Sequence, residues 1–451
     1  MINFLFIICL GVLYDVSLII FIKKVNKKII LCNYNLVLLL FMFVFSVMFP
    51  MCYVLSIKGF NYNVDFVKYF HEFNSVEILL YYLCIFIVTH SYLYSLRRKK
   101  INTFSINETV TNNNLTIIKK IKIIAYIMLF LGLISNFLYL KAYGGYFNYL
   151  NYSKLIRGGI FLLDNKFSFL APFRSCIIFS CYLFLAIWKS EKKKYLDFIM
   201  FTITFILSIF VLYSNNGRLS FVLFLLMILL FWMFSKSKVN TVNFKSIITI
   251  VAIVCLGGYL LVFVGNTLGR NSINSIVTEL NEEISFAFLN FKVINNKSFS
   301  TDYRFLKDII YMPLYILPSS FWSSNLGIKT SDAINTKIWK GSFKGENGNT
   351  GTMPIDFVSI SYLQFGIIGL FVIPVIYGWI ISKILEVIKT LDNKFIYRML
   401  YIYLFLNVIF DAIFYADPQH IISNIYPFII FMILYYFFKK IKIDYKTKNL
   451  I

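Results

Sequence analysis

Apolar runs, each long enough to cross a lipid bilayer, recur along most of this chain, and one long polar stretch interrupts them. A membrane-spanning helix needs about 20 mostly apolar residues. We read about eleven such runs, with approximate bounds 2–22, 33–55, 75–95, 121–140, 168–188, 195–213, 219–235, 246–264, 356–382, 395–415 and 420–438. The runs do not alternate polar and apolar residues as the strands of a membrane barrel do. The sequence therefore predicts an all-α, polytopic membrane helical bundle.

The composition excludes an ordinary soluble domain. Hydrophobic residues make up 59% of the chain and charged residues only 14%, which is typical of membrane proteins. The net charge of +23 would also suit a nucleic-acid partner, but the basic residues cluster at the ends of spans, as in the positive-inside rule. We therefore expect no nucleic-acid partner, and we expect membrane lipids to contact the basic loops.

These basic clusters predict an orientation. They follow the odd-numbered spans and include Lys23, Lys24, Arg97, Arg98 and Lys192. Because such clusters stay in the cytoplasm, the N-terminus is expected outside and the C-terminus inside. The predicted organisation is spans 1–8 over residues 1–264, a large extracytoplasmic loop over 265–354, and spans 9–11 with a basic cytoplasmic tail over 355–451.

The loop contains two recognisable patterns. Apolar residues from Ile273 to Phe291 recur at intervals of three and four, which predicts an amphipathic helix. The aromatic segment Tyr311–Ser323 contains Pro313 and Pro318 and is too short to span a bilayer. We expect it to lie at the membrane interface or to re-enter the membrane.

Metal and cofactor chemistry find no support in the sequence. The seven cysteines are scattered, and no pair has the spacing of metal ligands. No glycine-rich motif has the spacing of a nucleotide-binding loop. We predict that the protein uses neither a metal nor a cofactor.

Arg218 opens the seventh span at the predicted outer face. An arginine next to hydrocarbon is costly and is usually paired or functional, and its planar fork of donors suits phosphate oxygens. The alternative is an interfacial anchor that extends to lipid headgroups. Other arginines on the same side suggest a diphosphate ligand, although each would serve equally well on a solvated surface: Arg157, Arg174, Arg270 and Arg304.

Two ionisable residues near the last outer turn are candidates for proton transfer. Asp411 lies within an apolar run, where an ionisable group indicates a functional site by default. His420 follows the same turn. Either could be a general base. The alternatives are a hydrogen bond between helices for Asp411 and a plain loop position for His420.

Three segments carry a resemblance to a known family. The turn Gly217–Ser220 at the start of an apolar span resembles a recurrent feature of Wzy-type O-antigen polymerases. Thr350–Pro354 and Tyr362–Gly369 resemble the segment with which these oligosaccharide repeat unit polymerases re-enter the membrane, and the run Pro313–Trp322 is also similar. The acidic residue often found before the family's Phe-Gly pair is missing, because Ser359–Ser361 stand there.

The resemblance implies a glycosyltransferase of the cytoplasmic (inner) membrane. Such an enzyme takes undecaprenyl-diphosphate-linked oligosaccharide units and transfers the growing chain onto a sugar hydroxyl of the next unit, which builds O-antigen or capsular polysaccharide. A chain-length regulator and a flippase of the same pathway would be its partners. Two alternatives stay open, an O-antigen ligase and a lipid-linked oligosaccharide flippase.

The resemblance also suggests roles for the candidate residues. Arg218, Asp411 and His420 would be catalytic, the arginine stabilising the leaving diphosphate and the other two handling the hydroxyl proton. The remaining candidates would bind the substrate: Arg157, Arg270, Tyr303, Arg304 and Trp322.

Overall fold

The fold is helical wherever the structure describes it. The computed structural model describes residues 2–25, 32–61, 63–96, 112–158, 167–190, 194–214, 218–236, 276–297, 303–317, 320–349, 351–389, 391 and 393–440. The predicted eighth span, 246–264, and the first part of the predicted loop, 265–275, lie outside the described residues. In chain order the elements are α1 (Ile2–Val25), α2 (Cys32–Met42), η2 (Phe43–Met48), α3 (Phe49–Ile57), α4 (Val64–His71), α5 (Ser75–Leu96), α6 (Asn112–Lys141), α7 (Tyr146–Gly158), η3 (Ser168–Arg174), α8 (Ser175–Ser190), α9 (Tyr195–Ser214), α10 (Arg218–Lys236), α12 (Ile276–Lys297), α13 (Lys307–Ile310), η5 (Met312–Ile316), η6 (Ser320–Asn325), α14 (Ser331–Lys340), α15 (Phe357–Phe365), α16 (Gly369–Lys389), α17 (Lys394–Leu404), η7 (Phe405–Phe410), α18 (Asp411–Phe414) and α19 (Pro418–Lys440).

Many of these helices have the length and composition of membrane spans. Among the described residues, 9 stretches qualify: Asn3–Phe21, Val37–Ile57, Ser75–Leu96, Thr116–Lys141, Phe169–Ser190, Tyr195–Ser214, Gly369–Ile388, Lys394–Phe414 and Pro418–Lys439. The apolar part of α10, Ser220–Ser235, is shorter. The predicted class, a helical membrane protein, is confirmed.

The prediction of one continuous ninth span over 356–382 is wrong, because the chain reverses within it. Asp356 starts the short helix α15, and its carboxylate accepts hydrogen bonds from the backbone N–H groups of Val358 and Ser359. The helix ends at Gly366, whose φ of 61° favours glycine. The helix long enough to cross the membrane is α16, which begins at Gly369.

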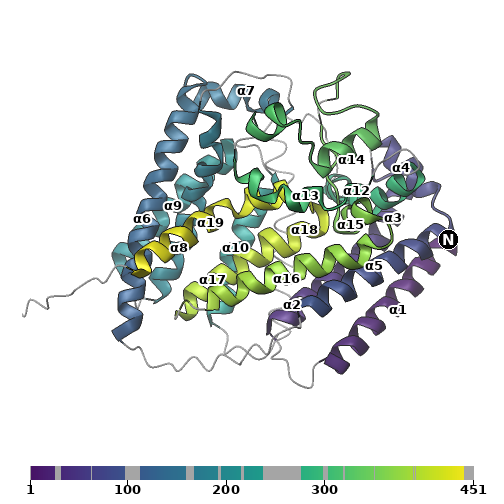
Figure 1. Cartoon of the computed structure of the whole chain (residues 1–451), viewed down its shortest axis with the longest axis horizontal. Helices are drawn as coiled ribbons and strands as arrows, with labels where there is room; N and C mark the ends of the chain where they lie inside the picture. The colour runs from purple at the N-terminus through teal and green to yellow at the C-terminus, as the bar shows by residue number, and fades with distance from the viewer. Residues whose placement is uncertain are drawn as a thin grey trace, which may run out of the picture.

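The described part of the large loop packs into the bundle. The predicted helix exists as α12, but residues 285–294 are buried on all sides rather than along one stripe. The helix contacts α3, α4, α14 and α15, and these elements gather at one end of the molecule (Figure 1). The polar side chains of α12 are therefore paired inside the protein. Asn281 donates hydrogen bonds to Ser56 Oγ and the Phe60 carbonyl, and Asn290 donates to the Pro354 carbonyl.

The buried carboxyl group of Asp356 gives a pH-dependent prediction. Burial raises its pKa to about 6, which is above the value expected in an unfolded chain. The folded state therefore holds the proton more tightly, and the wild type loses stability as the pH rises through this window. Asp356→Asn keeps a good N-cap oxygen but cannot ionise. We expect the variant to be more stable than the wild type at about pH 8, by on the order of 1–2 kcal/mol.

Unfolding in detergent at about pH 8 and about pH 4 tests this prediction. The difference between the two proteins should disappear at the lower pH, where Asp356 is protonated and neutral. A variant that is destabilised equally at both pH values would show that the carboxylate charge costs the fold nothing.

The tenth span changes pitch just before Asp411. The α-helix α17 continues as the π-helical segment η7, and α18 begins at Asp411. A π-helix accommodates more residues in each turn than an α-helix does. Tyr403, Asn407 and Asp411 come from these consecutive elements, and all three line the same cavity.

Candidate functional site

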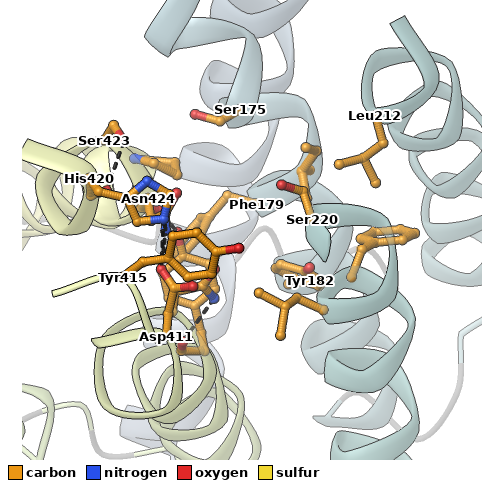
Figure 2. A pocket seen from close by; sticks show the side chains of 16 residues that line it. Ser175, Phe179, Tyr182, Leu212, Ser220, Asp411, Tyr415, His420, Ser423 and Asn424 are labelled. Atoms are coloured by element: carbon orange, nitrogen blue, oxygen red, sulfur yellow. Dashed lines mark hydrogen bonds and ion pairs between the residues drawn. The ribbon is translucent and has the colours of Figure 1, made fainter. Parts of the chain in front are cut away.

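A cavity of about 280 Å³ lies among residues of α8, α10, η7 and α19 (Figure 2). One part of its wall is aromatic and includes Phe179 and Tyr182 of α8. Asp411, His420, Ser423 and Asn424 lie together on one side of the cavity, and Ser220 lies across from them, beside Tyr182 (Figure 2). Ser175 and Asn407 also line the cavity. An aromatic surface facing several convergent polar groups is the usual make-up of a ligand site.

Asp411, His420 and Asn424 form a hydrogen-bonded group on the cavity wall. His420 Nε2 lies 3.0 Å from Asp411 Oδ2, and Asn424 Nδ2 donates to the same oxygen at 2.6 Å. Asn424 Nδ2 also lies 3.1 Å from His420 Nε2. The side chain of Asp411 is 1% exposed, whereas that of His420 is 34% exposed. The carboxylate therefore lies behind the imidazole, which remains accessible.

This arrangement orients the imidazole for proton transfer. The short Nε2–Oδ2 separation requires a proton between the two atoms, and with an ionised Asp411 that proton belongs to Nε2. A neutral imidazole protonated at Nε2 has its lone pair on Nδ1. Nδ1 can then accept a proton while Asp411 stabilises the resulting positive charge. The pair can therefore act as a general base.

Neighbouring groups hold this part of α19 in place. The Tyr415 ring stacks on the His420 ring, with centroids 5.2 Å apart and an interplanar angle of 28°. Ser423 Oγ donates to the His420 carbonyl at 2.8 Å, and the Tyr403 hydroxyl donates to the Asn424 carbonyl. Tyr415 therefore packs directly on the His420 ring, while Tyr403 and Ser423 bind the backbone of the same part of α19.

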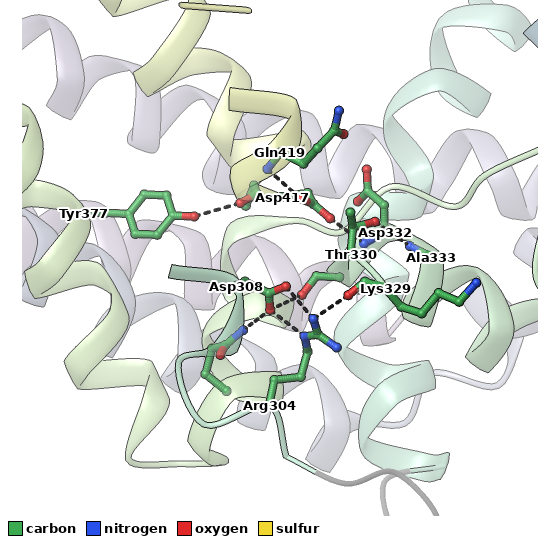
Figure 3. Close-up of polar contacts among 12 residues, drawn as sticks. Arg304, Asp308, Lys329, Thr330, Asp332, Ala333, Tyr377, Asp417 and Gln419 are labelled. Atoms are coloured by element: carbon green, nitrogen blue, oxygen red, sulfur yellow. Dashed lines mark hydrogen bonds and ion pairs between the residues drawn. The ribbon is translucent and has the colours of Figure 1, made fainter. Parts of the chain in front are cut away.

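A buried polar network connects α14 to the first turn of α19 (Figure 3). Asp417 accepts hydrogen bonds from the backbone N–H groups of Asp332 in α14 and Gln419 in α19. Burial, and after it the charge of Asp308, raise the pKa of Asp417 to about 6. Because Asp417 lies three residues before His420, the loop helix α14 is anchored directly beside the site.

Three of the predicted substrate-binding residues lie elsewhere. Arg304 is buried and forms a two-pronged ion pair with Asp308, through Nε at 2.6 Å and Nη2 at 2.7 Å. Trp322 is buried, and its Nε1 donates to the Leu317 carbonyl. Tyr303 is partly exposed and packs against Tyr362. None of the three lines the cavity described here.

The other predicted arginines are described in part or not at all. The helix α10 begins at Arg218, and Ser220, two residues further on, lines the cavity. Arg157 lies in the last turn of α7. The side chains of Arg218 and Arg157, and the whole of Arg270, lie outside the described residues. Arg174, also named from the sequence, is buried, where it donates hydrogen bonds to Asn136 and Ser214.

Sequence reasoning missed Asn424 and Asn407. A signal existed for Asn424, because it lies one helical turn after His420, and residues four apart on a helix share a face. Asn407 likewise lies one turn before Asp411. Their amides become informative only once Asp411 and His420 are known to meet.

Among the described residues, no three His, Cys, Asp or Glu side chains are grouped as a metal ion would require.

Comparisons with family models, with curated proteins and with solved structures found no match to this chain. The case for a function therefore depends on the cavity and on the residues that resemble the polymerase family.

Proposed function

We propose that this protein polymerises undecaprenyl-diphosphate-linked oligosaccharide units into a surface polysaccharide at the outer face of the cytoplasmic membrane. One observation carries the proposal. Ser220, from the turn that resembles the Wzy-type polymerases, lines the same cavity as Asp411 and His420. Ser220 is separated from Asp411 and His420 by about two hundred positions in the chain.

The reaction needs few protein groups. The oxygen of an acceptor sugar hydroxyl attacks the anomeric carbon of the donor chain, and the bond from that carbon to the diphosphate oxygen breaks. The diphosphate leaves with the electron pair, and the hydroxyl proton moves to Nδ1 of His420. Asp411 stabilises the imidazolium that forms. The proton returns to solvent after the product leaves.

The leaving diphosphate needs positive charge. Arg218, at the start of α10 and two residues before Ser220, would supply it, because guanidinium groups bind phosphate oxygens with two parallel hydrogen bonds. In this proposal the end of the bundle that holds α12 and α14 faces outside. The basic ends of α1, α8 and α10, with Lys23, Lys189 and Lys236, face the cytoplasm.

Deleting the gene tests the class of function. We expect cells to make surface glycan that carries a single repeat unit instead of long chains, and a plasmid copy of the gene should restore the long chains. The measurement is the length distribution of the glycan on a gel.

Two other outcomes would contradict the proposal. Loss of all surface glycan, with lipid-linked units held on the cytoplasmic side, would indicate a flippase. Long chains that remain on the lipid carrier and are not transferred to lipid A would indicate a ligase.

A further inference from the structure

Among the described residues of 305–326, named here the 305–326 segment, almost all exposed side chains are apolar. Phe305, Ile310, Ile316, Leu317, Phe321 and Leu326 are exposed, Ile310 to 64%. Among the described residues of the segment, Lys307 and Asn325 are the polar ones that share this exposed surface. In water, so large an apolar surface would favour aggregation or binding.

The opposite side of the same stretch is polar. The Arg304–Asp308 ion pair is buried there, and Ser331 Oγ and Gln364 Nε2 also donate to Asp308 (Figure 3). The indole N–H of Trp322 is likewise turned inward, to a backbone carbonyl. An element that faces water has its charged side chains on the outside and its apolar side chains inside. This segment has the opposite arrangement. It suits an element that faces hydrocarbon.

The exposed apolar surface continues onto a membrane span. The Phe305 N–H donates to the Gln364 carbonyl at 3.0 Å, and the Phe305 and Phe365 rings are 5.7 Å apart. The turn after Phe365 exposes Ile367, to 69%, and Ile368. The exposed residues Phe371, Val375 and Trp379 follow at four-residue intervals on the candidate span α16. The 305–326 segment therefore extends the stripe that α16 presents to lipid.

We propose that the 305–326 segment and the turn at 366–368 are embedded in the adjacent bilayer leaflet, with their apolar side chains among the lipid acyl chains. Embedding removes this surface from water, which is the main driving force for interfacial elements. The elements α13 and η5 contact α19, and α13 lies beside the start of α19 in Figure 1.

Fluorescence quenching tests this placement. Single cysteines at Ile310 and Leu326, labelled with bimane, would be measured in the full-length protein reconstituted with lipids brominated along the acyl chain. Val375→Cys on α16 is the lipid-facing control, and Lys344→Cys, at an exposed position in the loop, is the water-facing control. In all of these proteins the native cysteines, among them the exposed Cys9, are replaced by alanine, and the cysteine-free protein supplies the background.

We expect brominated lipid to quench positions 310 and 326 at least half as strongly as position 375, and aqueous iodide to quench them far less than position 344. Strong iodide quenching with weak lipid quenching would overturn the proposal, because the segment would then face water. Weak quenching by both agents would also overturn it, because another protein surface would then cover the segment. Elution of each labelled variant as one symmetric peak in size-exclusion chromatography in detergent, at the volume of the cysteine-free protein, shows that the labelled proteins are folded.

Discussion

His420→Ala should abolish polymerisation while leaving the protein in the membrane. The substitution removes the proposed base, whose side chain is partly exposed, and leaves Asp411 and Asn424 hydrogen-bonded to each other. A positioned general base typically contributes on the order of 10²–10⁴ in rate, so we expect glycan with a single repeat unit. Asp411→Asn keeps the shape of the side chain but removes the charge that stabilises the imidazolium. It should also give shorter glycan chains than the wild type.

The measurement is glycan chain length together with the amount of protein in the membrane. His71→Ala is the matched control, because His71 is an exposed histidine of α4 and does not line the cavity. It should give normal chains. If His420→Ala also polymerises normally at normal abundance, His420 is not the base, and the mechanism proposed above is wrong.

Gly369→Ala should have the largest effect on stability. A side-chain carbon at Gly369 would lie 1.9 Å from the carbonyl oxygen of Ser361, a distance that no pair of unbonded atoms tolerates. Because the obstacle is backbone, α15 and α16 would have to move apart. Overpacking of this kind costs about 1–3 kcal/mol or more, and here we expect the upper end of that range. The variant should accumulate poorly and should unfold at a lower temperature in detergent.

Gly11→Ala provides the comparison. Gly11 is also a glycine of a membrane-spanning helix, but a side-chain carbon there would meet its nearest neighbours at 3.4 Å, an ordinary contact. Alanine also favours the helix over glycine by about 1 kcal/mol. This variant should be at least as stable as the wild type. Equal stability of the two variants would mean that α15 and α16 are not packed as closely as described.

The sequence predicted the spans because bilayer thickness sets their length, and length and apolarity can be read directly from the residues. It failed at 356–382, where the hydropathy stays high across a reversal of the chain. Asp356 and Gly366 mark the two ends of α15. A cap residue and a single glycine are weak signals, however, when the hydropathy of the surrounding run predicts one continuous span.

The candidate site was predictable residue by residue, but its assembly was not. Asp411 and His420 could be named because ionisable groups are rare in apolar runs. Their contact depends on how the turn at 415–417 returns the chain to the same cavity. Arg304 shows the opposite case. Its partner Asp308 is four residues away in sequence, yet only burial distinguishes a closed ion pair from an arginine that is open to a ligand.

The π-helical segment η7 means that the site depends on the pitch of the helix between Tyr403 and Asp411. In a regular α-helix, which turns about 100° per residue, eight residues leave the second side chain roughly 80° out of line with the first. The wider turns of η7 reduce this angle, so Tyr403, Asn407 and Asp411 can all face the cavity. If the same eight residues formed a regular α-helix, Asp411 would rotate away from His420 even though every residue named in the mechanism was still present.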